Sequence, residues 1–488
     1  MKARMIRSGV TVLLVLFVCA GDAWAQALPR AVADLLVKVQ VPLDHVSVVV
    51  KEVGAKEPVL AWNADKAMNP ASVIKLVTTF AALELLGPAY TWKTEVLITG
   101  DLRHGTLAGD LVLKGAGDPK LTIERFWLLL RQLRERGLTS INGDLVLDRS
   151  FFESVPHDPA RFDGEPLNAY NVGPDALLLN FKTVRFHFSP TVDDKAVSIS
   201  PDVRPAQLEI VNRVKLIDGP CGDWRERVVA DIQTPMPARL KVTFTGSFSR
   251  RCGERVWNLS LLDHARFVGG VFAGLWREVG GSWNGAVRIA PVPADARLIA
   301  TSESPPLADA IRDINKYSNN VMARQLFLTL SAEINKQPGN QAASAQLILD
   351  WLARKDIRAA EMVLENGSGL SRIERISAAT LTQLLEAAWK SSVMPEFISS
   401  LSLVGIDGTL RKRGRNGKSD SIAGQAHIKS GSLNDVRAMA GYVLDSNGRR
   451  WMVVMLVNHP NAALAQAAQD ALLNAVYQSP GPSPVNEK

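Results

Sequence analysis

A serine and a lysine stand three residues apart in the otherwise apolar stretch "NPASVIKLVTTFAALELL" (residues 69–86). Asn69 is a favourable N-cap and Pro70 suits the first helical position, so Ser72 is expected in the first turn of a helix. Lys75 would share its helix face. Because burial lowers the pKa of a lysine, Lys75 could take the proton from Ser72 and make it a nucleophile. In isolation, however, such a pair is more often a capping serine beside a lysine that reaches solvent.

A Lys-Ser-Gly triplet, the only one of the Lys, Ser/Thr, Gly type in the chain, lies at Lys429, Ser430 and Gly431 on a predicted strand. A glycine inside a strand is costly unless another backbone or a ligand comes close to it. The lysine and serine side chains could hold a carboxylate, and a main-chain N–H nearby could complete an oxyanion hole. The triplet therefore favours an anionic substrate group beside a reacting carbonyl.

Three Ser-x-Asn triplets precede the Lys-Ser-Gly triplet in the chain, and they begin at residues 140, 282 and 318. The first two adjoin strand-like turns. Ser318 and Asn320 instead lie at the break between two helical patterns, a context that suits a loop reaching toward the helix of Ser72. We therefore select Ser318 and Asn320 as the third polar element of the candidate site.

Both ends of the chain are expected to position these residues on one antiparallel sheet covered by helices. Period-two and apolar runs predict strands over residues 46–53, 58–64, 426–432, 438–445 and 450–459. Helical periodicity dominates after residue 291 and again over residues 460–477. The middle of the chain, residues 92–291, consists of short strand-like pieces separated by turns. It is predicted to be a β-rich insertion; two similar pieces within it, which share "GDLVL", are too few for a solenoid.

Read in chain order, "SVIK", "SNN" and "KSG" are the motif set of the penicillin-recognising serine enzymes. Five longer segments narrow the match: "LVLKGAGDPKLT", "YNVGPDALLLNF", "ENGSGLSR", "GIDGTLRKR" and "IKSGSLNDVRAMAGYV". With these, the chain resembles the D-alanyl-D-alanine carboxypeptidase/endopeptidase family, the low-molecular-mass class C penicillin-binding proteins, over about residues 46–477.

The resemblance implies an α/β fold, with a penicillin-binding transpeptidase/β-lactamase-like domain and two nested β-rich inserted domains. The catalytic domain would comprise residues 26–91 and 292–478. The first inserted domain would comprise residues 92–180 and 262–291, and the inner one residues 181–261.

It also implies acyl transfer on peptidoglycan stem peptides and their crosslinks, inhibition by β-lactams that acylate the serine, and no metal or cofactor. Ser72 would attack the peptide carbonyl, Lys75 would accept its proton, and Ser318 would relay a proton to the leaving amine.

The same resemblance implies the substrate-binding residues. Asn320 would hydrogen-bond the substrate amide, and Lys429 with Ser430, beside Gly431, would bind the terminal carboxylate. The main-chain N–H groups of Ser72 and Ser432 would form the oxyanion hole. The family commonly has threonine where this chain has Ser430, so an altered substrate preference is expected.

Weaker candidates surround these motifs. Asp118 could contact the amino end of a stem peptide, although a turn-stabilising aspartate before Pro119 is an equal alternative. The glycine-rich segments "GSGLSR" and "GIDGTL" are expected to shape loops. The basic run over residues 411–418 is interpreted as a solvated loop that could also steer anionic wall polymer.

Residues 1–25 are interpreted as an export signal, with three basic residues before a short apolar run and "AWA" before the cleavage point. An exported, periplasmic protein without a later membrane span is expected, followed by a disordered tail over residues 479–488. Nucleic acid is an improbable partner for such a chain, despite its net charge of +7. In an oxidising compartment, Cys221 and Cys252 are expected to form a disulfide.

Two rival functions share these motifs. A β-lactamase would need a deacylating glutamate between the second and third motifs, and the nearest text, "EMVLENGSG", does not match the class A pattern. A non-catalytic wall-binding or β-lactam-sensing protein would have no need of both Ser72 and Lys75. Catalysis is therefore the preferred interpretation.

Overall fold

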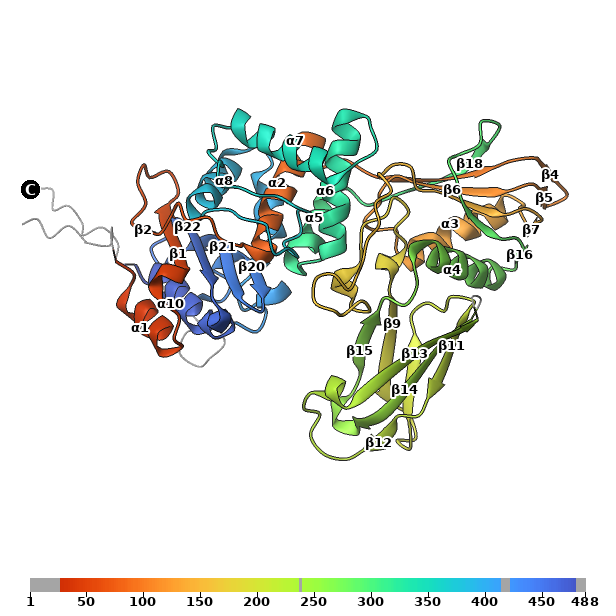
Figure 1. Cartoon of the computed structure of the whole chain (residues 1–488), viewed down its shortest axis with the longest axis horizontal. Coiled ribbons are helices and arrows are strands. Elements are labelled where there is room, and N and C mark those ends of the chain that lie inside the picture. Colours follow the sequence, from red (N-terminus) through yellow and green to blue (C-terminus); the bar gives the residue numbers. More distant parts are fainter. Residues whose placement is uncertain (1–26, 237–238, 414–421, 480–488) are drawn as a thin grey trace, which may run out of the picture.

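A six-stranded antiparallel sheet is built from both ends of the chain (Figure 1), in the order β19-β20-β21-β22-β1-β2. Its strands are β1 (Val46–Glu52), β2 (Leu60–Trp62), β19 (Ser402–Leu403), β20 (Ala426–Leu433), β21 (Val436–Leu444) and β22 (Arg450–Asn458). The predicted pairing of the two chain ends in one antiparallel sheet is thus confirmed.

The computed structural model describes residues 27–236, 239–413 and 422–479. The predicted export signal, Arg415 and Lys418 of the basic run, and residues 480–488 of the predicted tail lie outside these ranges. Within them, no helix is both long enough and apolar enough to cross a membrane.

Helices cover both faces of this sheet (Figure 1). On one face, α1 (Arg30–Lys38) and α10 (Gln466–Tyr477) form a core with Val48 and Val50 of β1. On the other face, Val49 belongs to the core of α2 (Lys75–Leu86) and α8 (Ala378–Lys390). The first strand is apolar at successive positions because it is buried on both faces. The remaining helices of this part are α5 (Leu307–Lys316), α6 (Asn320–Asn335), α7 (Gln341–Arg354) and α9 (Met394–Ser400).

The first insertion contains a five-stranded sheet in the order β17-β8-β6-β3-β18 and a smaller sheet in the order β16-β7-β5-β4. The two "GDLVL" pieces form β6 and β8, which pair in parallel with Leu111 opposite Leu145. The strands are β3 (Lys93–Ile98), β4 (Asp101–Arg103), β5 (Thr106–Ala108), β6 (Leu111–Gly115), β7 (Ser140–Ile141), β8 (Leu145–Asp148), β16 (Ser282–Trp283), β17 (Val287–Ile289) and β18 (Arg297–Glu303).

This insertion is β-rich as expected, but it also contains two helices that were not expected. The helices α3 (Ile123–Glu135) and α4 (His264–Glu278) pack on its sheets, and both bury apolar residues at helical spacing. The boundary expected at residue 292 is also too early. Residues 297–303 form β18, which pairs with β3 and so completes the inserted sheet before α5 begins.

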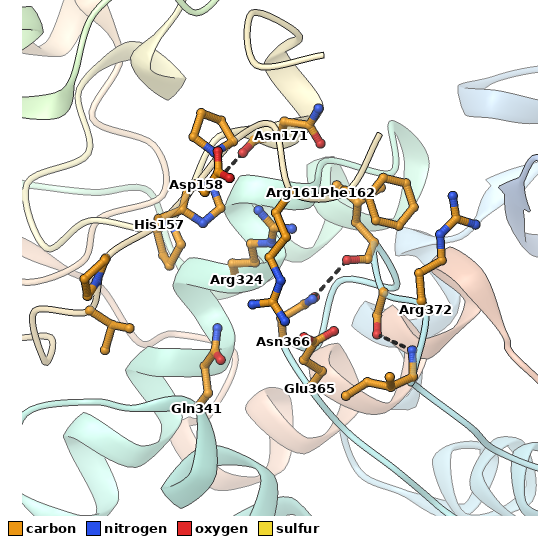
Figure 2. Close-up of a pocket in the computed structure, with 17 residues that line it drawn as sticks. His157, Asp158, Arg161, Phe162, Asn171, Arg324, Gln341, Glu365, Asn366 and Arg372 are labelled. Carbon is orange, nitrogen blue, oxygen red and sulfur yellow. Dashed lines mark hydrogen bonds between the residues drawn. The ribbon is translucent and has the colours of Figure 1, made fainter. Parts of the chain in front are cut away.

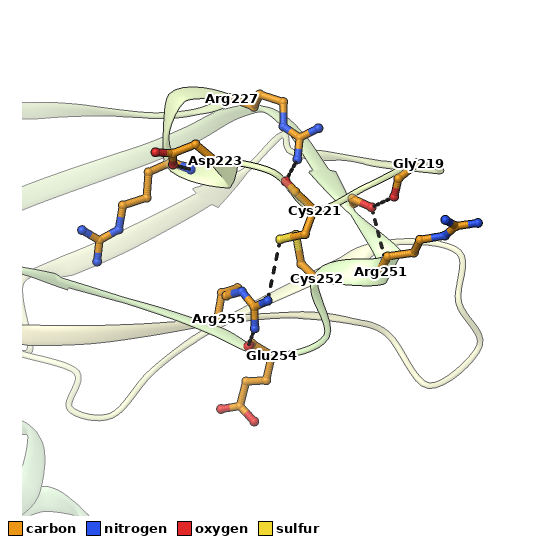
Figure 3. The surroundings of a disulfide bond; sticks show 10 residues. Gly219, Cys221, Asp223, Arg227, Arg251, Cys252, Glu254 and Arg255 are labelled. Atoms are coloured by element: carbon orange, nitrogen blue, oxygen red, sulfur yellow. Dashed lines mark hydrogen bonds between the residues drawn. A yellow bond between two sulfur atoms is a disulfide. The ribbon is translucent and has the colours of Figure 1, made fainter. Parts of the chain in front are cut away.

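The inner insertion consists of two small sheets (Figure 1). They are built from β9 (Val184–Pro190), β10 (Val197–Pro201), β11 (Leu208–Asn212), β12 (Lys215–Ile217), β13 (Val228–Met236), β14 (Arg239–Ser249) and β15 (Arg255–Leu259). Cys221 and Cys252 form the predicted disulfide, next to Arg227 and Arg255 (Figure 3).

Candidate active site

The turn that carries Ser72 is tighter than the sequence suggests. Ser72 lies in a short 3-10 helix (Ala71–Ile74), and the α-helix α2 begins only at Lys75. The Asn69 side chain accepts the N–H of Ala71 at 2.8 Å, and Ala71 has a φ of +44°. A left-handed conformation at a non-glycine residue is a strained arrangement of the kind found at functional sites. Ala71 directly precedes Ser72, and Ser72 is partly accessible in a cleft.

Lys75 is completely buried and contacts three oxygen atoms around its amine. Its Nζ lies 2.9 Å from Ser72 Oγ and 2.8 Å from Asn320 Oδ1, and it also contacts the carbonyl oxygen of Ser368. A neutral amine has two N–H donors and one lone pair. With Asn320 and Ser368 as acceptors for the two donors, the lone pair can face the Ser72 hydroxyl.

The electrostatic surroundings favour this neutral amine. The pKa of Lys75 is held well below its ordinary value of 10.5, chiefly by burial. The positive charge of Lys429, and to a smaller degree that of Arg324, also lowers this pKa, whereas Glu374 raises it. A lowered pKa increases the fraction of neutral amine, which is the form that can accept a proton from Ser72.

Ser318 and Lys429 form the second pair in the site. Ser318, with a φ of +56°, lies at the break between α5 and α6. Lys429 is buried on β20, and its Nζ donates to Ser318 Oγ at 3.0 Å and to the Ser430 carbonyl at 2.8 Å. Burial lowers the pKa of Lys429 to about 7. The chosen Ser-x-Asn triplet is thus the one that the fold brings to Ser72 and Lys429.

Gly431 allows β20 to pass directly over the Ser72 turn. A Cβ at this position would lie 2.6 Å from the Pro70 carbonyl oxygen and 3.1 Å from the Ser72 nitrogen. Neither backbone atom can move away as a flexible side chain would. The close approach expected from a glycine inside a strand is therefore present, and the approaching group is the backbone of the turn that carries Ser72.

The cleft also contains residues that sequence reasoning did not single out. Thr409 Oγ1 lies 2.8 Å from Ser430 Oγ, and Arg437 lines the same cleft from β21. Ser72, Ser318, Ser430, Gly431 and Ser432 all line it. Thr409 belongs to the "GIDGTL" segment, so its motif was visible. Its contact with Ser430 was not, because the two meet only through tertiary folding.

Asp118 lies apart from this cleft. It is 2% exposed, and its Oδ1 accepts the N–H of Lys120 at 2.7 Å. This geometry corresponds to the turn-stabilising alternative, and Asp118 is not among the residues that line the cleft around Ser72.

Figure 2 shows a second cavity, which is distinct from the cleft around Ser72. Charged side chains of both signs line it, among them Arg161, Arg324 and Arg372 together with Asp158 and Glu365. Among the described residues, no group of histidine, cysteine, aspartate and glutamate side chains has an arrangement that could hold a metal ion.

Comparisons with known proteins identify the family of the chain. The model of the D-Ala-D-Ala carboxypeptidase 3 (S13) family matches residues 28–477. The D-alanyl-D-alanine carboxypeptidase DacB of Haemophilus influenzae is 25% identical over 417 residues, 85% of each chain. The D-alanyl-D-alanine carboxypeptidase of Actinomadura sp. strain R39 is 26% identical over 440 residues, 87% of this chain and 80% of the relative.

The fold has a solved counterpart as well. The crystal structure of penicillin binding protein 4 from Haemophilus influenzae superposes with a TM-score of 0.74 at 25% identity, covering 92% of this chain and 100% of the other. Since the family model spans nearly the whole chain, the chain belongs to the D-Ala-D-Ala carboxypeptidase 3 (S13) family.

Proposed function

We propose that this protein is a serine-type D-alanyl-D-alanine carboxypeptidase that also cleaves peptidoglycan crosslinks as an endopeptidase. The observation that carries the proposal is the buried Lys75 amine 2.9 Å from Ser72 Oγ, in a cleft that Ser318 and Ser430 also line. Membership of the family and the names of the two carboxypeptidase relatives support it.

In the acylation step, Ser72 Oγ attacks the carbonyl carbon of the penultimate D-Ala while its proton passes to Lys75. The main-chain N–H groups of Ser72 and Ser432 stabilise the oxyanion of the tetrahedral intermediate. The C–N bond then breaks, and the leaving amine receives a proton through Ser318. Water hydrolyses the resulting ester and restores the serine.

Substrate binding uses the other end of the cleft. Protonated Lys429, with the hydroxyl of Ser430, holds the terminal carboxylate, and Asn320 hydrogen-bonds the amide of the substrate. Thr409 fixes the direction of the Ser430 hydroxyl through the contact of 2.8 Å. A β-lactam carries a carboxylate and a strained amide at a similar spacing, so it acylates Ser72 and leaves slowly.

The proposed site of action is the periplasm. Peptidoglycan lies outside the cytoplasmic membrane, and residues 1–25 have the composition of an export signal. A disulfide in the inner insertion suits an oxidising compartment.

The test is the intact mass of the protein after incubation with benzylpenicillin. We expect one stable adduct on the parent protein, none on Ser72→Ala, and the parent behaviour for Ser399→Ala, an exposed serine of α9. The absence of an adduct on folded parent protein would favour the binding-protein alternative. Rapid multiple-turnover hydrolysis of penicillin would favour the β-lactamase alternative.

A further inference from the structure

A buried carboxylate with no role in the acyl-transfer steps lies on the segment that follows the second motif. Glu374 is 0% exposed. Its Oε1 accepts three successive backbone N–H groups, those of Glu365 at 3.2 Å, Asn366 at 3.0 Å and Gly367 at 3.0 Å. Burying a charged group costs free energy unless hydrogen bonds or opposite charges compensate it, so a buried glutamate at this position is expected to affect the structure around it.

The loop that Glu374 holds, residues 365–369, is attached to the nucleophile's helix. The Thr78 hydroxyl of α2 donates to the Gly367 carbonyl at 2.8 Å. The next carbonyl, that of Ser368, contacts Lys75 Nζ. Loop and nucleophile therefore cannot shift independently.

Backbone packing makes this attachment tight. Gly369 has a φ of +82°, and a Cβ there would lie 2.1 Å from the Ala71 carbonyl oxygen and 2.6 Å from the Ser72 nitrogen. The same loop also contributes Glu365 and Asn366 to the second cavity, which Arg324 lines as well (Figure 2). The loop therefore contacts the Ser72 turn and also borders that cavity.

Within this loop, the Ser368 carbonyl orients the amine of Lys75. It and Asn320 Oδ1 take the two N–H donors of the neutral Lys75 amine, so that the lone pair faces Ser72. If the carbonyl turned away, one N–H would lose its acceptor and the amine could rotate. The position of the loop therefore controls the direction of the base.

Charge provides a second link between Glu374 and Lys75. The charged groups that act on Lys75 are Lys429 and Arg324, both positive, and Glu374, which is negative. One carboxylate oxygen, Oε2, has no hydrogen-bond partner within the described part of the chain. Burial raises the pKa of Glu374, whereas its three backbone N–H contacts and the charge of Lys75 act in the opposite direction and favour the carboxylate. As a carboxylate, Glu374 opposes the two positive charges near Lys75.

We propose that Glu374 is a positioning residue for acylation: it holds residues 365–369 so that the Ser368 carbonyl orients Lys75, and its negative charge offsets those of Lys429 and Arg324. The inference rests on the proposed function of Ser72 and Lys75. It assigns Glu374 no contact with the substrate.

The test compares Glu374→Gln and Glu374→Ala with the parent protein by the rate constant of acylation with benzylpenicillin, measured as a function of pH. Glu374→Ala removes all three acceptor contacts, and we expect acylation to slow by roughly ten- to a hundred-fold, as displacement of a catalytic group does. Glu374→Gln keeps the shape and removes the charge. Because a negative charge raises the pKa of Lys75, its loss should move the acid limb of the profile to lower pH.

Glu361→Gln is the matched control. Its carboxylate also accepts a backbone N–H of this segment, that of Ser377 at 3.0 Å, and a hydroxyl, that of Thr380 at 2.7 Å. We expect it to lower the melting temperature but to leave the rate and the acid limb unchanged.

A Glu374→Gln protein with the parent's rate and acid limb would overturn the inference, even if its melting temperature fell. This comparison remains decisive if Glu374→Ala does not fold. Failure of the parent protein to acylate would instead overturn the proposed function, so the two failures are distinguishable.

Discussion

At the scale of single residues, the proposed mechanism gives two buried lysines opposite tasks. In it, Lys75 loses its proton to act as a base, whereas Lys429 keeps one to bind a carboxylate. Burial lowers the pKa of both, and the charge of Lys429 lowers that of Lys75 further. The protonated state of Lys429 thus assists the neutral state of Lys75.

The pH dependence of substrate binding follows from this division. Since the pKa of Lys429 is about 7 in the free protein, its ammonium is present below that pH and is lost above it. For a D-Ala-D-Ala peptide, kcat/KM is therefore expected to fall as the pH rises through about 7. An alkaline limb that survives unchanged in Lys429→Arg, whose guanidinium keeps its charge, would contradict this assignment.

Thr409 gives a second prediction at this scale. Thr409→Val removes the hydroxyl that orients Ser430 and keeps the shape of the side chain. Loss of a hydrogen bond worth about 1 kcal/mol should raise KM for a D-Ala-D-Ala peptide roughly fivefold, with little change in kcat. Steady-state kinetics measure the effect, and Thr139→Val, in the first insertion, is the control. A changed kcat at constant KM would argue against a role in carboxylate binding.

At the scale of elements, the site forms where β20 crosses the 3-10 turn of Ser72. Gly431→Ala would place a methyl group 2.6 Å from the Pro70 carbonyl oxygen. Strand and turn must separate by a fraction of an ångström, so acylation by benzylpenicillin should slow by roughly a hundredfold in a protein that still folds. Acylation at the parent rate would show that the two elements need no such contact.

Most of the candidate site could be predicted from short sequence motifs. The chemistry of the Ser72 and Lys75 pair, and of the triplet at Lys429, follows from the residue types and their spacing in the sequence. Glu374 and Thr409 were not predictable. Their contacts join segments far apart in the sequence, and neither residue type is unusual in a loop. The sheet that combines strands from both ends of the chain could also be predicted, because these strands have alternating or continuous apolar residues. By contrast, helix α3 was not predicted, because short strands precede and follow it in the sequence. Its buried residues nevertheless have helical spacing: Phe126, Leu129, Leu130 and Leu133.

At the scale of the whole molecule, the disulfide and the catalytic cleft belong to different cores. Cys252 packs in the core of the insertions, whereas Lys75 begins α2, whose apolar residues pack in a different core. The double substitution of Cys221 and Cys252 by serine should destabilise the inner insertion by about 3–4 kcal/mol. We expect earlier proteolytic cleavage within residues 181–261, with an unchanged acylation rate at 25 °C. A simultaneous loss of acylation would instead show that the stability of the inner insertion is coupled to the catalytic cleft.

The sheet that joins both chain ends also sets a time order for the molecule. Val48 of β1 pairs with Met455 of β22, and Ser72 needs Lys429 and Gly431 from β20. At roughly 5–20 residues per second, synthesis of the chain between these segments takes on the order of tens of seconds. Throughout that interval the nascent chain carries Ser72 without the groups of β20 that the proposed mechanism uses to bind a substrate. The proposed hydrolytic activity therefore arises only after β20 has been synthesised.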